Sequence, residues 1–243
     1  MKNEHCYKNG KRLEMKSPPI RLAIATVALI EHVSPAWTDH MQQIYKELES
    51  LKTEIDFEWQ HHFVYNKPRF TARQEVTEAI LKHPIGYTHM LFLDCDTFPT
   101  KGSIKHMLQL SMNQDYPVLC YPVYLKRMPL ISNIYEDVMF APICKLPRTV
   151  FKIDLTGLAA CLIELEVFKK IQPPYFEGDW RVMAANDINF HLKTGEDTAF
   201  FFKLKRAEIS VMCDPAYIWE HYDDARDLFY PSLIGNKERC YEG

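Results

Sequence analysis

The sequence predicts an α/β protein, with a mixed, mainly parallel sheet flanked by helices in a single domain. Apolar runs typical of buried strands alternate with amphipathic segments of helical period through the first half of the chain. The 243 residues, 47% of them hydrophobic, can bury one sizeable core. No repeat, low-complexity tract or Gly/Ser linker divides the chain, so the domain is expected to cover residues 19–222.

The first half of this domain, residues 19–125, shows a regular alternation of elements. Short apolar runs bounded by turn residues predict strands at 21–29, 56–65, 89–93 and 118–124. Apolar residues three and four positions apart predict helices at 36–53, 71–83 and 101–113. Strands joined by helices in this way run parallel, and ligands bind beyond their carboxyl ends.

The second half, residues 126–222, is less regular. Apolar runs at 149–155 and 159–164 predict a hairpin, and a late strand is expected at 209–213. Helices are predicted at 166–171, before Pro173-Pro174, and at 196–206. The polar ends of the chain are expected to form a flexible N-terminal tail, residues 1–18, and a C-terminal tail or lid, residues 223–243.

Charge and cysteine content narrow the class of protein. Lys and Arg number 29 and Asp and Glu 32, a net charge of −3 that argues against a dedicated nucleic-acid coat. The longest uncharged apolar run, residues 22–30, is far shorter than the roughly 20 residues that cross a bilayer, and no secretory signal is evident. The seven cysteines form no C-x-x-C pair, which predicts reduced thiols. A cytoplasmic protein without integral membrane association is therefore expected.

Asp94 and Asp96 are the residues that most clearly suggest chemistry. They follow the predicted strand at 89–93, where an α/β sheet receives its ligand. Because strand side chains repeat every two residues, both carboxylates can emerge on one side, where a cation would relieve their repulsion. Oxygen ligands without thiolates favour Mg²⁺ or Mn²⁺, which often join protein carboxylates to substrate phosphates. In the alternative interpretation, Asp94 forms a turn and Asp96 caps the next helix.

Four segments, in this order along the chain, resemble nucleotide-sugar glycosyltransferases of the GT-A fold, and in particular their family-2-like members. Residues 87–99 resemble the DXD element, through Asp94-Cys95-Asp96. Residues 156–163 resemble a G-x-x-x-x-L-I segment that lines the active site, and residues 194–207 resemble the G-E-D-x-x-F helix. Residues 214–221 resemble the D-P…H ending. The Q-x-x-R-W motif of the processive synthases is absent from the sequence.

The resemblance implies a GT-A, Rossmann-like fold and transfer of a hexosyl or pentosyl group from a UDP- or GDP-sugar to an acceptor hydroxyl. It implies Mn²⁺ or Mg²⁺ bound directly by Asp96, with His221 as a further ligand. Asp94 would bind a metal-bound water or the ribose hydroxyl. Such an ion stabilises the charge on the leaving nucleoside diphosphate. His221 could instead be a polar residue without a metal.

The catalytic pair implied by the resemblance is Glu196-Asp197. Transfer with inversion needs a carboxylate that accepts the proton of the incoming hydroxyl, and we assign Asp197 as this base and Glu196 as an acceptor contact. Both also begin a predicted helix, where the dipole favours anions, so helix capping is the alternative role.

A further group of residues is expected to bind the nucleotide. Thr26 and Ala28 end the first predicted strand, where such folds receive the base, and Gly157 belongs to the segment that lines the site. Arg73, Lys126 and Arg127 could bind the diphosphate, because a guanidinium forks onto phosphate oxygens and an ammonium acts as a point charge. Each of the three could instead be a solvated surface charge. Trp180 could stack on an acceptor sugar or base, or belong to the core.

Two other functions fit the same residues. A sugar nucleotidyltransferase also needs carboxylates and a divalent ion, but residues 25–35 contain no Gly for the phosphate loop with which that class begins. A non-catalytic nucleotide-sugar-binding module is the second alternative. The acceptor could be a glycan, a small molecule or a modified base in DNA, the last through a groove with Lys203, Lys205 and Arg206.

Overall fold

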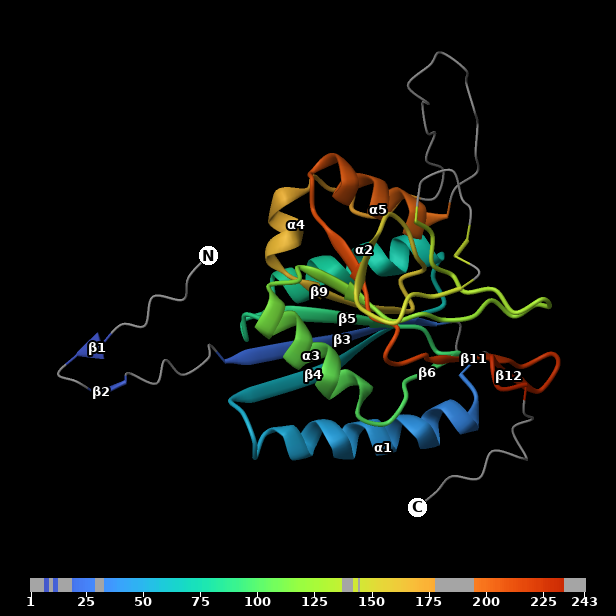
Figure 1. Ribbon diagram of the computed structural model, residues 1–243, viewed down its shortest axis with the longest axis horizontal. Coiled ribbons are helices and arrows are strands. Elements are labelled where there is room, and N and C mark those ends of the chain that lie inside the picture. The colour runs from blue at the N-terminus through green and yellow to red at the C-terminus, as the bar shows by residue number, and fades with distance from the viewer. Residues whose placement is uncertain are drawn as a thin grey trace, which may run out of the picture.

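The computed structural model describes residues 19–28, 33–136, 142–143, 145–177 and 195–233, and the backbone of residues 7–8 and 11–12. Trp180 and the predicted tail beyond residue 233 lie outside the described residues. Figure 1 shows a central sheet with helices on both faces. Within the described part of the chain, no helix is long and apolar enough to span a membrane.

In the described residues, the central sheet has seven strands in the order β4-β3-β5-β9-β7-β10-β8. Strands β3, β4, β5, β7 and β10 run in one direction, whereas β8 and β9 run in the other. The mixed, mainly parallel sheet predicted from the sequence is therefore confirmed. The strands are β3 (Ile20–Ala28), β4 (Phe57–Tyr65), β5 (His89–Leu93), β7 (Val118–Cys120), β8 (Phe151–Ile153), β9 (Ala160–Glu164) and β10 (Val211–Cys213).

Helices cover both faces of the sheet because alternate residues of its buried strands point to opposite sides. On β3, Ala23 and Ala25 belong to the apolar cluster that includes α2 (Arg69–Leu81), α4 (Glu166–Lys170) and α5 (Glu196–Arg206). Leu22 and Ile24 belong to the opposite cluster, with α1 (Pro35–Leu51) and α3 (Ser103–Gln114). Since a slip by one residue would exchange the two faces, these clusters fix the register of the sheet.

The helices that follow parallel strands begin at the edge where those strands end. The chain passes from β3 to α1, where the Ser34 side chain accepts a hydrogen bond from Trp37 N at 3.1 Å and Pro35 takes the first helical position. It passes from β4 to α2, which begins directly after Pro68. The start of α2 therefore lies beside the carboxyl ends of β3 and β5, where the sequence predicts the ligand.

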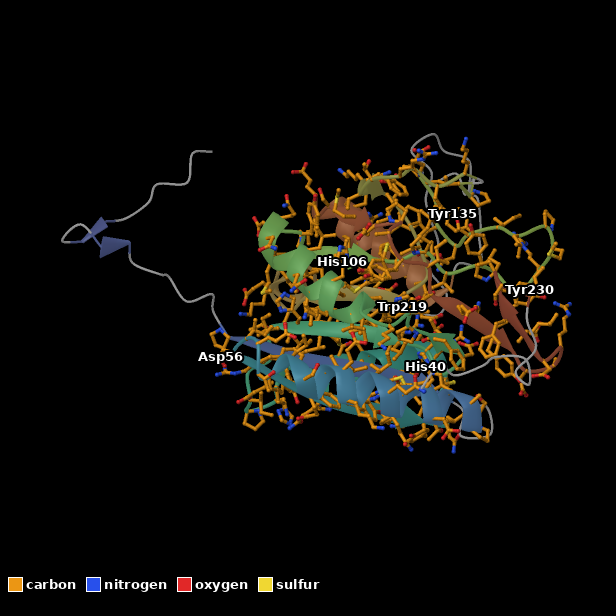
Figure 2. The ribbon with its side chains drawn as sticks, turned by 60° about the horizontal axis from the view of Figure 1, so that its bottom comes forward. His40, Asp56, His106, Tyr135, Trp219 and Tyr230 are labelled. Carbon is orange, nitrogen blue, oxygen red and sulfur yellow. The ribbon has the colours of Figure 1, made fainter. Side chains whose placement is uncertain are left out.

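A small antiparallel sheet lies at the same end of the molecule. In the described residues it consists of β6 (Thr97–Phe98), β11 (Glu220–Asp223) and β12 (Leu228–Tyr230). Asp56, before β4, and Tyr230, in β12, lie at opposite ends of the domain in Figure 2. Because His221 pairs with Thr97 in this sheet, the backbone brings His221 next to the segment that carries Asp96.

One sequence-based expectation, the hairpin of the second half, differs from the structure. Residues 149–155 and 159–164 do not form a hairpin, because β7 and β10 lie between β8 and β9. Apolar runs close in sequence are often paired, and no local pattern shows that other strands separate these two. The predicted lid is packed over its described part, where Phe229 is fully buried against Phe98 with ring centroids 4.9 Å apart. Within residues 1–18, the backbone of β1 (Tyr7–Lys8) pairs with that of β2 (Lys11–Arg12).

Candidate active site

Two clefts meet at the carboxyl ends of β3 and β5. The first, of about 580 Å³, is lined by the end of β3, the start of α2 and the segment after β5. The second, of about 400 Å³, is lined by residues 123–126 and 157–159, with Asn133, Asp197 and His221. Arg69, Asp94 and Asp96 line both clefts. Volumes of this size are typical of small-molecule sites, and the place is the one that α/β sheets use for ligands.

The side chain of Arg73 is completely buried and binds three carboxylates. Its Nη2 donates to both oxygens of Asp94, at 3.0 and 3.2 Å. Its Nη1 donates to Glu196 Oε1 at 3.1 Å and to Asp197 Oδ1. The guanidinium also lies over the Phe92 ring, 5.7 Å from its centroid. One buried cation thus joins α2, the end of β5 and the start of α5.

This placement of Arg73 differs from the expected contact with a diphosphate. The guanidinium is 0% exposed and lines neither cleft. A buried Arg must be paired, and its planar fork suits several carboxylates at once. In the structure Arg73 therefore orients acidic side chains, while Lys67, Arg69 and Lys126 bring positive charge to the clefts.

Asp96 is held by a different pair of residues. Its Oδ2 accepts a hydrogen bond from Lys126 Nζ at 2.5 Å and lies 3.2 Å from His221 Nε2. Burial alone would raise the pKa of the Asp96 carboxyl, but the hydrogen bond and charge of His221, together with Lys126, outweigh burial and lower it. Asp96 is therefore a carboxylate at neutral pH, and its side chain is about one-third exposed (34%).

The orientation of the His221 ring suits a metal ligand. Nδ1 lies 3.0 Å from the carbonyl oxygen of Tyr124, which can only accept, so Nδ1 carries the proton. A hydrogen bond from Nε2 to Asp96 Oδ2 needs a proton on Nε2, and without that proton Nε2 would offer its lone pair to a metal ion. Mg²⁺ and Mn²⁺ are commonly bound by one or two protein side chains together with substrate phosphates, so Asp96 and His221 fit such an ion.

Asp94 does not join this pair, although the sequence suggests a cation between the carboxylates of Asp94 and Asp96. Both oxygens of Asp94 accept hydrogen bonds from Arg73, because the guanidinium of α2 reaches the end of β5. Within the described residues, no three His, Cys, Asp or Glu side chains are grouped so that they could hold a metal ion. Among the carboxylates and histidines that line the second cleft, Asp96 and His221 thus lie side by side, while Asp94 is paired with Arg73.

Asp197 faces Gly157 in the second cleft. A Cβ on Gly157 would lie 3.6 Å from Asp197 Oδ2 and 3.0 Å from Asn133 Nδ2. The Asn133 side chain is itself fixed, since its Oδ1 accepts from Val123 N at 3.1 Å. One oxygen of Asp197 thus binds Arg73, and the other faces a space that the glycine keeps open.

Glycines, rather than the acidic residues, hold the N-cap positions of α5 (Gly195) and α3 (Gly102). Glu196 and Asp197 lie in the first turn of α5. The acids of α5 instead pair with arginines of α2: Glu196 Oε1 binds Arg73 and lies 3.8 Å from Arg69 Nε. The N-terminal turn of α5 therefore faces the site with both carboxylates, where the helix dipole favours anions.

Thr26 also lies elsewhere than expected for a nucleotide contact. It is fully buried, and its hydroxyl donates to the Leu93 carbonyl oxygen at 2.7 Å. Its oxygen therefore accepts from His61 Nε2, at 2.8 Å, while His61 Nδ1 accepts from the Tyr45 hydroxyl at 2.6 Å. This series of hydrogen bonds fixes Leu93, the residue before Asp94. Ala28, in contrast, lines the first cleft as predicted.

Cys95 lines the first cleft between the two aspartates but is not activated as a nucleophile. Burial raises the pKa of its thiol to about 12, and the charges of Asp96 and Asp94 act in the same direction. A reactive cysteine has a lowered pKa, so covalent catalysis by Cys95 is disfavoured.

The sequence-based reasoning missed several residues that line the clefts. Asn133 went unnoticed because nothing in its local sequence marks it. The turn before α2 did carry a signal, since Pro68 follows a predicted strand and precedes a helix, at the edge of the sheet that binds ligands. Arg127, by contrast, is exposed and lines neither cleft. The missed residues of the first cleft are Val27, Asn66, Lys67 and Pro68.

Comparison with solved structures shows the fold. No protein-family model and no curated protein sequence matches the chain. A197 from STIV is similar with a TM-score of 0.60 at 18% identity, over 87% of this chain and 91% of that chain. The two chains therefore share a fold.

Glycosyltransferases are also among the similar structures. GalNAc-T7 with UDP, GalNAc and Mn²⁺ has a TM-score of 0.49 at 9% identity, over 85% of this chain and 44% of that chain. The catalytic domain of Drosophila β1,4-galactosyltransferase 7, in complex with xylobiose, has a TM-score of 0.47 at 14% identity, over 90% and 72%. This chain thus spans less than half the length of GalNAc-T7.

Proposed function

We propose that this protein is a glycosyltransferase that moves a hexosyl or pentosyl group from a UDP- or GDP-sugar to an acceptor hydroxyl. The observation that carries the proposal is the junction of two clefts at Asp94 and Asp96, with Asp197 on the side of the second cleft. A donor in the first cleft and an acceptor in the second would meet at these carboxylates. Such a junction is what transfer between two bound molecules requires.

The first cleft suits a nucleoside diphosphate. Val27 and Ala28 provide an apolar wall for a base, while Lys67 and Arg69 bring positive charge to the other side. At its junction with the second cleft lie Asp96 and His221, the proposed ligands of Mn²⁺ or Mg²⁺. A divalent ion there would neutralise the diphosphate as its bond to the sugar breaks.

Asp197 is the proposed base. Its Oδ1 is fixed by Arg73, and its Oδ2 faces the cleft beside Gly157. A carboxylate held in this way can accept the proton of an acceptor hydroxyl in the transition state, which suits an inverting reaction. Glu196, paired with Arg73 and near Arg69, acts as a positioning residue rather than as the expected acceptor contact.

The acceptor proposed here is a glycan or a small molecule. The lysines of the DNA-binding groove considered above are neutralised, since Lys203 Nζ lies 2.6 Å from Glu177 Oε1 and Lys205 Nζ lies 2.5 Å from Asp154 Oδ2. We further propose a reducing, cytoplasmic setting, because all four described cysteines are free thiols.

A product assay tests the function. The protein is incubated with UDP- and GDP-sugars, Mn²⁺ and a panel of hydroxyl acceptors, and released nucleotides are separated. Nucleoside diphosphate released only with an acceptor supports the transferase, pyrophosphate indicates a nucleotidyltransferase, and binding without turnover indicates a binding module. Asp96→Ala should abolish release, whereas Asp39→Ala, at an exposed position of α1, should not. Full activity in excess chelator would refute the metal requirement.

A further inference from the structure

The Asp96 carboxylate, which the proposed function assigns as a metal ligand, already has a cationic partner in Lys126. Its ammonium binds Oδ2 of Asp96, the same oxygen that faces His221 Nε2. Any other cation that used this oxygen and His221 would meet the ammonium at close range, and two cations repel. Lys126 and a divalent ion therefore cannot both keep the contact that Lys126 makes here.

The local charge explains why Asp96 has such a partner. Asp94, Glu196 and Asp197 share the guanidinium of Arg73, and Glu196 also lies 3.8 Å from Arg69 Nε, so these three acids still outnumber their two arginines. A fourth carboxylate at the same junction would add to their repulsion unless a cation faced it. Lys126 provides that charge from the protein itself.

The backbone of Lys126 is anchored while its side chain can move. Arg226, in the turn between β11 and β12, donates to the Lys126 carbonyl oxygen at 3.0 Å and also binds Asp223 Oδ2 at 3.2 Å. The side chain of Lys126 is 29% exposed and lines the second cleft. A lysine carries its charge on a flexible four-carbon stem, so the ammonium can leave Asp96 without a change in the loop.

We propose that Lys126 is the resident counter-ion of Asp96, which a divalent ion must displace, and that the released ammonium binds the diphosphate at the junction of the two clefts. The inference rests on the proposed metal site at Asp96 and His221. In this exchange, the binding of the metal and the binding of the substrate strengthen each other. The metal is bound weakly while Lys126 has no other partner, and more tightly once a diphosphate takes the ammonium.

Mn²⁺ binding in the absence of any sugar tests this exchange. Free aqueous Mn²⁺ is measured by electron paramagnetic resonance during titration of the wild type, Lys126→Met and Lys67→Met. Methionine keeps an unbranched stem and removes the charge. Lys67 is the matched control, because it lines the neighbouring cleft and binds Glu75 rather than Asp96.

Lys126→Met should bind Mn²⁺ roughly three- to tenfold more tightly than the wild type, since a competing ion pair of ordinary strength is removed. Lys67→Met should bind Mn²⁺ as the wild type does, and Asp96→Asn should weaken binding in both the wild-type and Lys126→Met backgrounds. With UDP as the probe, the increase in Mn²⁺ affinity on adding nucleotide should be smaller in Lys126→Met. In the wild type the diphosphate takes the ammonium from Asp96 and so favours Mn²⁺, and this coupling is lost with the ammonium.

Several outcomes would overturn the inference. If Asp96→Asn weakens Mn²⁺ binding but Lys126→Met leaves it unchanged or weaker, the metal site stands and the exchange is refuted. An equal gain in Lys67→Met would show a general charge effect and also refute it. If neither the wild type nor Lys126→Met binds Mn²⁺, the metal part of the proposed function fails together with the exchange, and Lys126 is the permanent partner of Asp96.

Discussion

Arg73 and Asp197 stand 124 positions apart in the sequence and form an ion pair at the centre of the candidate site. The pair joins α2, which follows the second strand of the central sheet, to α5, which precedes one of its last strands. Since Arg73 is completely buried, it is a charged residue of the protein core. The carboxylates that line the clefts are therefore positioned from inside the protein.

Replacing Arg73 should destabilise the protein. Arg73→Met leaves Asp94, Glu196 and Asp197 close together without their cation, and removing one partner of a buried ion pair costs about 3–5 kcal/mol. We expect a loss of about 3 kcal/mol in the free energy of unfolding, measured by urea denaturation. Arg148→Met, at an exposed position, should change it by less than about 0.5 kcal/mol. Equal effects of the two substitutions would contradict the role given to Arg73.

Asp197→Asn should separate chemistry from binding. The asparagine carbonyl oxygen can keep the contact with Arg73 Nη1, so the fold and the donor cleft should be preserved. The amide cannot accept a proton, so turnover should fall by about a hundredfold or more. The measurement is kcat for transfer beside the dissociation constant of UDP or GDP. A parallel loss of nucleotide affinity would assign Asp197 to donor binding, and a product of retained configuration would remove the need for a base.

Gly157→Ala tests whether the second cleft must stay open beside Asp197. The new Cβ would lie 3.0 Å from Asn133 Nδ2 and 3.6 Å from Asp197 Oδ2, so it would crowd the proposed acceptor position. Activity should fall while the midpoint of thermal unfolding shifts by only a few degrees. Gly195→Ala is the matched control, because nothing lies within 4 Å of the added Cβ. If Gly195→Ala reduced activity as strongly, crowding near Asp197 would not be the cause.

Stability should fall as the pH drops from 7 to 4.5. Burial, assisted by the charge of His62, lowers the pKa of His61 to about 3, and burial lowers that of His89 to about 4. Because an unfolded histidine titrates near pH 6.5, unfolding takes up protons below that pH. Each histidine should reduce the free energy of unfolding by up to about 1.4 kcal/mol per pH unit.

Urea denaturation at a series of pH values measures this effect. In His61→Gln and in His89→Gln the slope of stability against pH should be smaller than in the wild type. The slope is the informative quantity, because loss of the hydrogen bonds of His61 with Thr26 and Tyr45 lowers stability at every pH. An unchanged slope in both variants would show that neither ring is kept neutral by burial.

Much of the fold could be predicted from the sequence because its signals are local. The strand at 89–93 and the helix at 196–206 have the predicted bounds, since apolar period and turn residues act over a few positions. The separation of β8 from β9 could not be read in this way. It depends on which strands pair across the whole chain, and the local sequence of β8 or β9 does not indicate that pairing.

The candidate site, too, could be predicted only as far as local motifs reach. The motifs located Asp94, Asp96, Asp197 and His221, which all line the second cleft. They did not show which charges meet, because Arg73 contacts acids 21 and 123–124 positions away. A surface arginine and a fully buried one look alike in sequence when their partners are so distant.

The position of β9 has a consequence for how the chain acquires its structure. This strand belongs to residues 126–222, yet it lies between β5 and β7, which belong to residues 19–125. A fragment that ends near residue 125 would leave the facing edges of β5 and β7 without the strand that joins them. During synthesis, the acidic cluster must therefore wait until α5 has emerged, and the complete sheet until β10 has followed it. Contacts of such long sequence separation form slowly, so expression of the two halves as separate polypeptides should yield aggregation-prone pieces rather than two working modules.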